Sequence, residues 1–319
     1  MALGMRKAFW NSALKLSLIG LALVLLHQKV DWNELRALEI KASTLMLWQA
    51  TVGFLLLFAL NLSLDALSWK TVQGILRSVT LKEAFLHNLK AYALAFITPF
   101  NSGELAGRYL AQRQKEHRQK TLYLTFWAHA PKLFSKASVG FPLAFFVFIP
   151  NSGQSLWLIF LALAYALLLF SYFKLEKVLS FFEKRQIRER KLNHYLVKGR
   201  PFWREKLKLL LVNALRFLCF SGQMALVLTA LDPALLNLSL LASLPVYYFL
   251  TAIIPTWAAF DFLVKSVLSL FFFAFLTDQE ILFALASAVV WLFNVAVPAL
   301  TGLALFNPAE LKTIKVRRV

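Results

Sequence analysis

The chain has 319 residues, of which 59% are hydrophobic and 16% are charged, and its formal net charge is +19. Soluble domains average about 45–50% apolar and about 25% charged residues, so this composition excludes an ordinary soluble domain and predicts an all-α polytopic membrane protein. A large positive charge favours a nucleic acid partner in a soluble protein. Here the basic residues lie between apolar runs, where they set the topology and face anionic headgroups, so we expect membrane lipids as partners and no nucleic acid.

Six apolar runs come close to the roughly 20 residues that a helix needs to cross a bilayer. The first run follows Arg6 and Lys7 as in a signal peptide, but no small-residue cleavage site precedes His27. We therefore interpret this run as a retained first span. The six predicted full spans are residues 9–26, 45–67, 121–149, 154–173, 208–230 and 281–306.

Two further apolar segments are interrupted by prolines, which break or kink helices. Pro99 interrupts residues 84–104, and both Pro245 and Pro255 interrupt residues 239–277. We interpret the two segments as re-entrant hairpins, which together with the six full spans give the equivalent of eight spans. Alternatively, each segment is a pair of complete spans.

The distribution of Lys and Arg orients the spans, because cytoplasmic loops carry the excess of these residues. Residues 174–208 contain twelve Lys and Arg against four Glu, and basic residues also follow Asn307. We therefore expect both segments, and both chain termini, in the cytoplasm. Three short connections without Lys or Arg are expected on the opposite side, at residues 150–153, 231–238 and 277–280.

This orientation predicts an inverted repeat within a single transmembrane domain, residues 1–319. Basic residues flank residues 84–104 on both sides, so this segment enters from the cytoplasm, whereas residues 239–277 enter from the outside, as discontinuous helices do in inverted-repeat transporters. The linker has the apolar spacing of an amphipathic helix on the inner leaflet, although a solvated loop is the alternative. The predicted parts are a first half (1–173), this linker (174–208), a second half (209–306) and a basic tail (307–319).

Each broken segment contains an acid followed four residues later by a base. In the first case the acid is Glu104, at the end of the segment, and the base is Arg108, which follows it. The two share one helix face and can neutralise each other. Charges inside a membrane are costly and usually mark a functional site, although a pair at the membrane interface that fixes topology is the alternative. Between Pro99 and Glu104 the chain reads Asn101, Ser102 and Gly103, and Asn101 or Ser102 can cap a new helix that starts near Gly103. The N-terminus of such a helix suits a phosphate.

The second pair is Asp261 and Lys265, which are the only charged residues between Asp232 and Asp278. Two more cations, Lys132 and Arg216, fall within predicted spans, where they need a partner, a cavity or a lipid phosphate unless they snorkel to the interface. Glu104 and Asp261 are the candidate partners. In the last span, Asn294 and Pro298 indicate a kink or an interhelical hydrogen bond.

The sequence carries poor signals for an enzyme. The five histidines lack metal-ligand spacing, and there is neither a nucleotide-binding glycine loop nor a nucleophile elbow. The single cysteine, Cys219, lies in an apolar run typical of a core thiol. We expect no catalytic residue, no metal and no cofactor.

The two motifs resemble those of a flippase-like transmembrane family typified by the membrane region of lysylphosphatidylglycerol synthases. That family carries a Pro-x-x-x-Gly-Glu motif followed by Arg, which Pro99, Gly103, Glu104 and Arg108 match. Its second proline-containing segment corresponds to Pro255, Asp261 and Lys265, and the pattern of Asn294 and Pro298 is also similar. The resemblance implies movement of lipid between leaflets, inverted halves and re-entrant helices. Because the family's bifunctional members append an aminoacyl-transferase domain and this chain ends at Val319, we expect no synthesis of aminoacyl lipids.

Our hypothesis is a lipid translocase of a bacterial-type inner membrane that shelters a headgroup in a central polar cavity. The substrate is expected to be an anionic phospholipid or a lipid-linked molecule. The sequence does not decide whether the protein forms a homo-oligomer. One alternative is an integral membrane transferase that uses Glu104 as its acid. The other is a non-transporting scaffold that docks a partner through residues 174–208. The expected substrate-binding residues are Asn101, Ser102, Glu104, Arg108, Lys132, Arg216, Asp261 and Lys265, and the expected helix breaks are at Pro99, Gly103 and Pro255.

Overall fold

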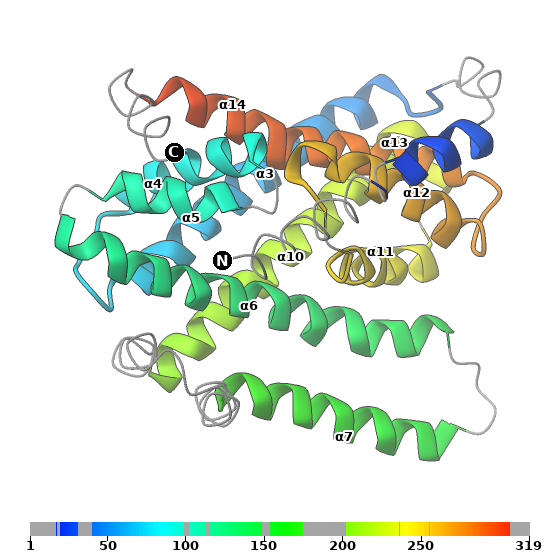
Figure 1. Cartoon of the computed structure of the whole chain (residues 1–319). Helices are drawn as coiled ribbons and strands as arrows, with labels where there is room; N and C mark the ends of the chain where they lie inside the picture. Colours follow the sequence, from blue (N-terminus) through cyan, green and yellow to red (C-terminus); the bar gives the residue numbers. More distant parts are fainter. Residues whose placement is uncertain are drawn as a thin grey trace.

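The computed structural model describes residue 17 and residues 20–30, 40–98, 102–112, 115–148, 154–174, 202–235, 237–254 and 256–306 (Figure 1). Secondary structure in these residues is entirely helical, which confirms the predicted all-α class. The helices are α3 (Thr44–Gln73), α4 (Leu81–Ile97), α5 (Ser102–Ala111), α6 (Lys115–Phe148), α7 (Gln154–Phe173), α10 (Trp203–Leu231), α11 (Leu238–Thr251), α12 (Asp261–Phe273), α13 (Glu280–Trp291) and α14 (Val297–Ala304). The structure also contains a helical segment at residues 20–29, two short 3₁₀ turns, η2 (Pro233–Leu235) and η3 (Ala258–Phe260), and a π-helical turn, η4 (Leu292–Ala296).

Several predicted features lie outside the described residues. They are most of the first span, Pro99, Asn101, Pro255, the greater part of the predicted linker and the basic tail.

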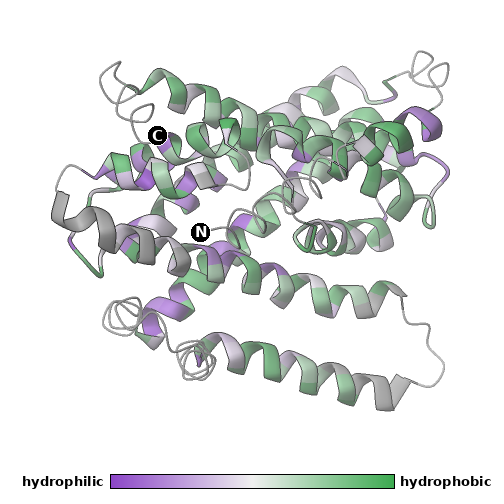
Figure 2. Ribbon diagram, viewed as in Figure 1, coloured by the Kyte–Doolittle hydropathy of each residue, from purple (hydrophilic) through white to green (hydrophobic). Residues whose placement is uncertain are grey.

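Three helical stretches among the described residues are long and apolar enough to cross a membrane. They are α3, α10 and the continuous run α13–η4–α14, which covers Glu280–Ala304. These stretches contain the predicted spans 45–67 and 208–230 and nearly all of 281–306. Helices α6 and α7 coincide with two more predicted spans, and α7 lies at one edge of the molecule beside α6 (Figure 1). Figure 2 shows mainly hydrophobic residues on α13 and α14, with hydrophilic residues gathered on α5 and the start of α10.

Helices α3 and α10 form an antiparallel pair at the centre of the fold. Their axes approach closely at two glycines: a Cβ on Gly53 would lie 3.1 Å from Leu226 Cδ1, and one on Gly222 would lie 2.9 Å from Leu57 Cδ1. Small residues at such contacts allow tight helix packing in membranes, where no hydrophobic force drives helices together. The pairing brings polar side chains of the two helices to the same level, and Asn213 Nδ2 donates to Ser68 Oγ across it at 3.0 Å.

The first broken segment and the residues that follow it form an antiparallel hairpin of α4 and α5. A Cβ on Gly103 would lie 1.9 Å from the Leu94 carbonyl oxygen, and one on Gly107 would lie 2.5 Å from Ala91 Cα. The predicted helix near Gly103 does form, and Thr98 Oγ1 accepts from the Gly103 N–H at 2.8 Å, which satisfies a donor at its start. On its other side, α4 contacts α14 just as closely, because a Cβ on Gly302 would lie 2.0 Å from the Leu89 carbonyl oxygen.

The second broken segment contains α11, η3 and α12, and one predicted break in it is wrong. Pro245 lies inside α11 rather than ending a helix. Proline is tolerated within membrane helices because neighbouring groups satisfy the freed carbonyl. The interruption falls instead between Thr251 and Asp261. There the two broken segments meet, since Trp257 Nε1 donates to the Phe96 carbonyl at the end of α4 at 3.1 Å.

We predict that Gly107→Ala destabilises the protein by loosening the α4–α5 hairpin. The new Cβ would lie 2.5 Å from the backbone of Ala91, and such overpacking typically costs about 1–3 kcal/mol. The measurement is the temperature at which detergent-purified protein loses its monodisperse peak in size-exclusion chromatography.

The matched control is Gly20→Ala, because nothing lies within 4 Å of a Cβ at Gly20. Equal melting temperatures for the two variants would contradict the close α4–α5 contact.

Candidate functional site

Five charged side chains from four helices meet within the helical bundle, and we call them the ion-pair cluster. They are Asp65 of α3, Glu104 and Arg108 of α5, Lys132 of α6 and Arg216 of α10. Four of the five have side chains that are at most 11% exposed, and that of Lys132 is 25% exposed. The sequence analysis predicted four members as site residues and missed Asp65.

Glu104 is the centre of one half of the cluster. Its Oε1 lies 2.7 Å from Arg108 Nη2 and 3.8 Å from Lys132 Nζ, and its Oε2 lies 3.1 Å from His129 Nε2. The predicted pairing of Glu104 with Arg108 on one helix face is therefore present. The His129 side chain is 46% exposed, so this half of the cluster reaches the protein surface.

Arg108 is almost fully buried, with 2% of its side chain exposed. Its guanidinium lies over the ring of Trp69, 3.8 Å from the centroid, in a cation–π contact. Within the described chain, its Nε and Nη1 have no hydrogen-bond partner. Buried donors normally find partners, so this guanidinium retains capacity to bind a further acceptor.

Asp65 is the centre of the other half. It accepts hydrogen bonds from Asn88 Nδ2 at 2.7 Å and Tyr92 Oη at 2.6 Å, and it forms ion pairs with Arg216 and, at 3.5 Å, with Lys132. The predicted partners of Arg216, Glu104 and Asp261, are thereby corrected, because the antiparallel α3–α10 pair places Asp65 closest to it. One signal pointed to Asp65: it is the sole acid in the predicted span 45–67.

A chain of amide side chains extends the cluster toward α13. Arg216 Nε donates to Asn61 Oδ1 at 3.1 Å, Asn61 Nδ2 donates to Asn294 Oδ1 at 2.7 Å, and Asn294 Nδ2 donates to Gln223 Oε1 at 2.8 Å. The predicted interhelical hydrogen bond of Asn294 is confirmed. Asn294 lies in the π-turn η4, and such turns are frequent at functional sites.

Asp261 and Lys265 form a second, separate pair at the start of α12. Lys265 Nζ lies 2.5 Å from Asp261 Oδ2, and Thr256 Oγ1 donates to Asp261 Oδ1 at 2.5 Å. Lys136, one turn after Lys132 on α6, interacts electrostatically both with this pair and with Lys132 and Arg216. Lys136 and Lys132 thus place two cations of α6 near the two predicted charge pairs, and no ion pair joins the two pairs directly among the described residues.

The remaining predicted site residues fall around the α4–α5 turn. Ser102 is the first residue of α5 and Gly103 the second, so both lie directly before Glu104. No group of His, Cys, Asp and Glu that could hold a metal occurs in the described part of the chain. What the arrangement offers is positive charge: three cations face two carboxylates in the ion-pair cluster.

Most of the chain matches a known protein family. The family described as "Lysylphosphatidylglycerol synthase TM region" matches residues 12–259, which is well over half of the chain. The matched region contains the whole ion-pair cluster and ends just before Asp261. A search of curated proteins found no match.

We predict that Asp65→Asn strongly destabilises the protein. The change leaves Arg216, whose side chain is 8% exposed, buried without its charge partner, and breaking a buried ion pair costs about 3–5 kcal/mol. The double variant Asp65→Asn/Arg216→Gln should be less destabilised than the sum of its single variants. Unfolding by denaturant in detergent micelles measures these free energies.

Arg77→Gln is the control, since Arg77 forms a looser, 4.0 Å pair with Glu83 whose side chains are 30% and 45% exposed. Such a pair contributes about 0–1 kcal/mol. Additive effects of the Asp65 and Arg216 substitutions would refute their coupling.

Proposed function

The chain belongs to the family of the lysylphosphatidylglycerol synthase transmembrane region, and on this basis we propose that it moves a phosphate-bearing lipid between the two leaflets of a membrane. In this proposal the headgroup crosses along the ion-pair cluster while the hydrocarbon chains stay among the lipids. The family and the apolar helices establish a multi-pass membrane protein related to lipids. Translocation, and a location in a bacterial inner membrane with cytoplasmic termini, are our proposals.

The observation that carries the proposal is the surplus of positive charge in the ion-pair cluster. A charge in the centre of a bilayer costs about 2.5–3.5 kcal/mol on insertion scales. Three cations against two carboxylates therefore leave a net positive charge that a passing anion can neutralise. Arginine suits a phosphate because its planar fork donates two parallel hydrogen bonds, and Arg108 has two buried donors free of partners in the described chain.

Lys132 gives the cluster a way to accommodate the headgroup. Its ammonium lies between the two carboxylates, 3.5 Å from Asp65 and 3.8 Å from Glu104. Its 25% exposure makes it the most accessible member. An arriving phosphate can draw Lys132 away from either carboxylate without leaving that carboxylate unpaired, because each has its own arginine.

The broken segments support opposed half-entries into the membrane. Helix α5 has 10 residues and is about 15 Å long, about half of the roughly 30 Å hydrocarbon layer. Its antiparallel packing on α4 returns the chain toward the side from which α4 starts. The contact of Trp257 with the end of α4 places the second break against the first, as expected where two half-helices meet near the midplane.

We predict that Glu104→Gln and Asp261→Asn each lower lipid translocation about tenfold or more. Each change removes a carboxylate charge that takes part in at least one close ion pair, and about 1.4 kcal/mol of barrier corresponds to a factor of ten. The assay reconstitutes the purified protein in liposomes with a fluorescent phospholipid and follows the loss of fluorescence when an impermeant reductant is added.

The control is Glu83→Gln, which removes the same charge at the 45% exposed side chain of Glu83. Translocation that survives in both motif variants would refute the mechanism. Release of a transferred group from a lipid-linked donor, lost in Glu104→Gln, would establish the transferase instead.

We also predict opposite accessibility of the two breaks. In a Cys219→Ser background, which removes the only cysteine, Ser102→Cys should react with an impermeant thiol reagent from the cytoplasm and Ala258→Cys from the outside. Labelling of both positions from one face would refute the opposed half-entries.

A further inference from the structure

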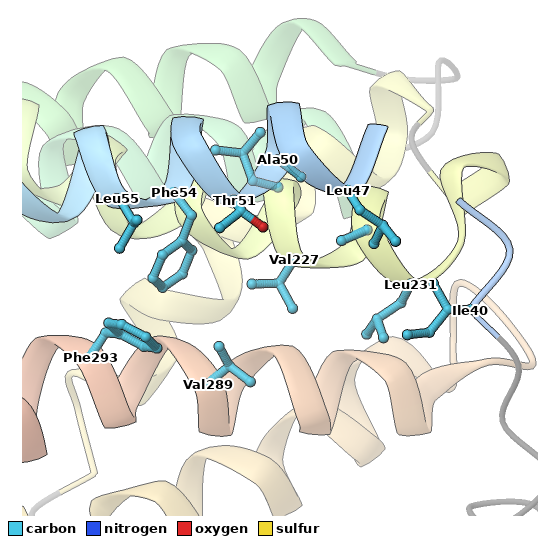
Figure 3. A pocket seen from close by; sticks show the side chains of 12 residues that line it. Ile40, Leu47, Ala50, Thr51, Phe54, Leu55, Val227, Leu231, Val289 and Phe293 are labelled. Carbon is cyan, nitrogen blue, oxygen red and sulfur yellow. The ribbon is translucent and has the colours of Figure 1, made fainter. Parts of the chain in front are cut away.

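An apolar crevice lies between the three helical stretches that are long enough to span a membrane. It has a volume of about 240 Å³ and opens between α3, α10 and α13 (Figure 3). Thr51 supplies the only polar side chain among the residues that line it. Its walls include Ala50, Thr51 and Phe54 of α3, Val227 of α10, Val289 of α13 and Phe293 of η4.

One end of the crevice lies next to an ion pair at the end of α10. Ile40 and Leu231 line this end, and the following residues pair with each other, since Lys41 Nζ lies 2.6 Å from Asp232 Oδ2. The hydrogen bond from Lys41 holds the pKa of the Asp232 carboxyl below its usual range. The Lys41 side chain is 60% exposed, so this end of the crevice adjoins the protein surface.

The other end of the crevice lies next to the amide chain of the candidate site. The rings of Phe54 and Phe293 pack edge to face there, with centroids 5.0 Å apart. The residue after Phe293 is Asn294, which bonds Asn61. Phe54 and Asp65 are eleven residues apart on one continuous helix, a distance of about 16 Å. The apolar crevice and the ion-pair cluster therefore lie one after the other along the α3–α10 pair.

We propose that this crevice holds one hydrocarbon chain of the lipid whose phosphate occupies the ion-pair cluster. The proposal rests on the proposed function and adds a binding site to it, with a straight, flexible hydrocarbon chain as the ligand. Water-soluble ligands do not fit, because the lining is apolar and the walls are spanning helices, outside which only lipid chains are abundant.

The direction of the crevice agrees with the orientation of a lipid in the inner leaflet. The Lys and Arg distribution places Asp232 outside and the start of α10 in the cytoplasm. The ion-pair cluster then lies toward the cytoplasmic half and the crevice toward the outer half. A lipid that enters from the inner leaflet carries its headgroup on the cytoplasmic side, so its chain points from the cluster into the crevice.

The crevice also limits how the chain is recognised. Contacts with Val227, Val289 and Phe293 are apolar and lack direction, so they select a hydrocarbon chain without selecting its chemical type. A fatty acyl chain and a polyprenyl chain share this chemistry. Two probes, one labelled on an acyl chain and one on a polyprenyl chain, distinguish these two kinds of lipid.

The experiment is photocrosslinking in phosphatidylcholine vesicles that contain the full-length protein and a trace lipid probe. The first probe is phosphatidylglycerol with a diazirine on one acyl chain, and the second is a polyprenyl phosphate with a diazirine on its chain. A diacylglycerol with the same acyl diazirine lacks the phosphate and serves as the headgroup control. Crosslinked positions are mapped by mass spectrometry of proteolytic peptides.

Thr51→Trp is the principal variant, because Thr51 lines the crevice from an exposed position and a large ring there fills it without displacing buried neighbours. Val227→Trp fills the crevice from the opposite wall. Leu56→Trp is the matched control, since Leu56 is 65% exposed on the same helix and does not line the crevice. A monodisperse size-exclusion peak is required of all three proteins.

We expect a phosphate-bearing probe to label peptides containing Val227 and Val289 in the wild-type protein, and the diacylglycerol to label them about tenfold less. Filling the crevice should lower that labelling about tenfold or more, which is the effect of an overpacking cost above about 1.4 kcal/mol. Leu56→Trp should leave it unchanged. The probe that labels more strongly identifies the chain as acyl or polyprenyl.

Equal labelling in Thr51→Trp and Leu56→Trp, or equal labelling by the phosphate-free probe, would overturn the inference. It would also be overturned if neither phosphate-bearing probe reached the crevice, as when a segment of this chain fills it. The proposed function fails separately, in the liposome assay. Crevice labelling that depends on phosphate but occurs without translocation would leave a lipid-binding site in a protein that does not move lipids.

Discussion

The charge pairing of two carboxylates inside the bundle, Asp65 and Glu104, is the interaction on which the rest of the site depends. Lys132 Nζ lies 3.5 Å from Asp65 and 3.8 Å from Glu104, and so joins α6 to α3 and α5. Each carboxylate also has its own arginine, from α10 or from α5. In an apolar surrounding an isolated charge is far costlier than a paired one. The ion pairs therefore favour one packing arrangement of α3, α5, α6 and α10.

Close backbone contacts hold the helices in the positions that this pairing requires. Helix α4 lies between two glycine-bearing neighbours, with Gly103 and Gly107 of α5 on one side and Gly302 of α14 on the other. Close approach substitutes for the hydrophobic force that is missing between helices in lipid. It also holds the start of α5, with Glu104 in its first turn, against α4. The close helix contacts thus position the side chains that form the ion pairs.

Polar and apolar chemistry are divided along the α3–α10 pair. Toward the end of α3 lie Asp65 and its cationic partners, and toward its start lies the crevice around Phe54. The amide chain through Asn294 lies between the two regions. An amphiphilic ligand has the same division, with a charged headgroup and a hydrocarbon chain. The proposed transport of a lipid headgroup and the proposed chain site are therefore two consequences of one arrangement.

The sequence by itself determined the membrane class and the positions of the long helices, because the length of an apolar run is a local property. It also determined the helix break before Glu104, through proline chemistry, and the pairs Glu104–Arg108 and Asp261–Lys265, through their i,i+4 spacing. Only the tertiary structure decided that Arg216 pairs with Asp65, that Lys132 bridges two carboxylates and that Pro245 stays within a helix. These outcomes depend on which helices stand side by side. A contact such as that between residues 65 and 216 joins positions far apart in the chain, and no local pattern encodes it.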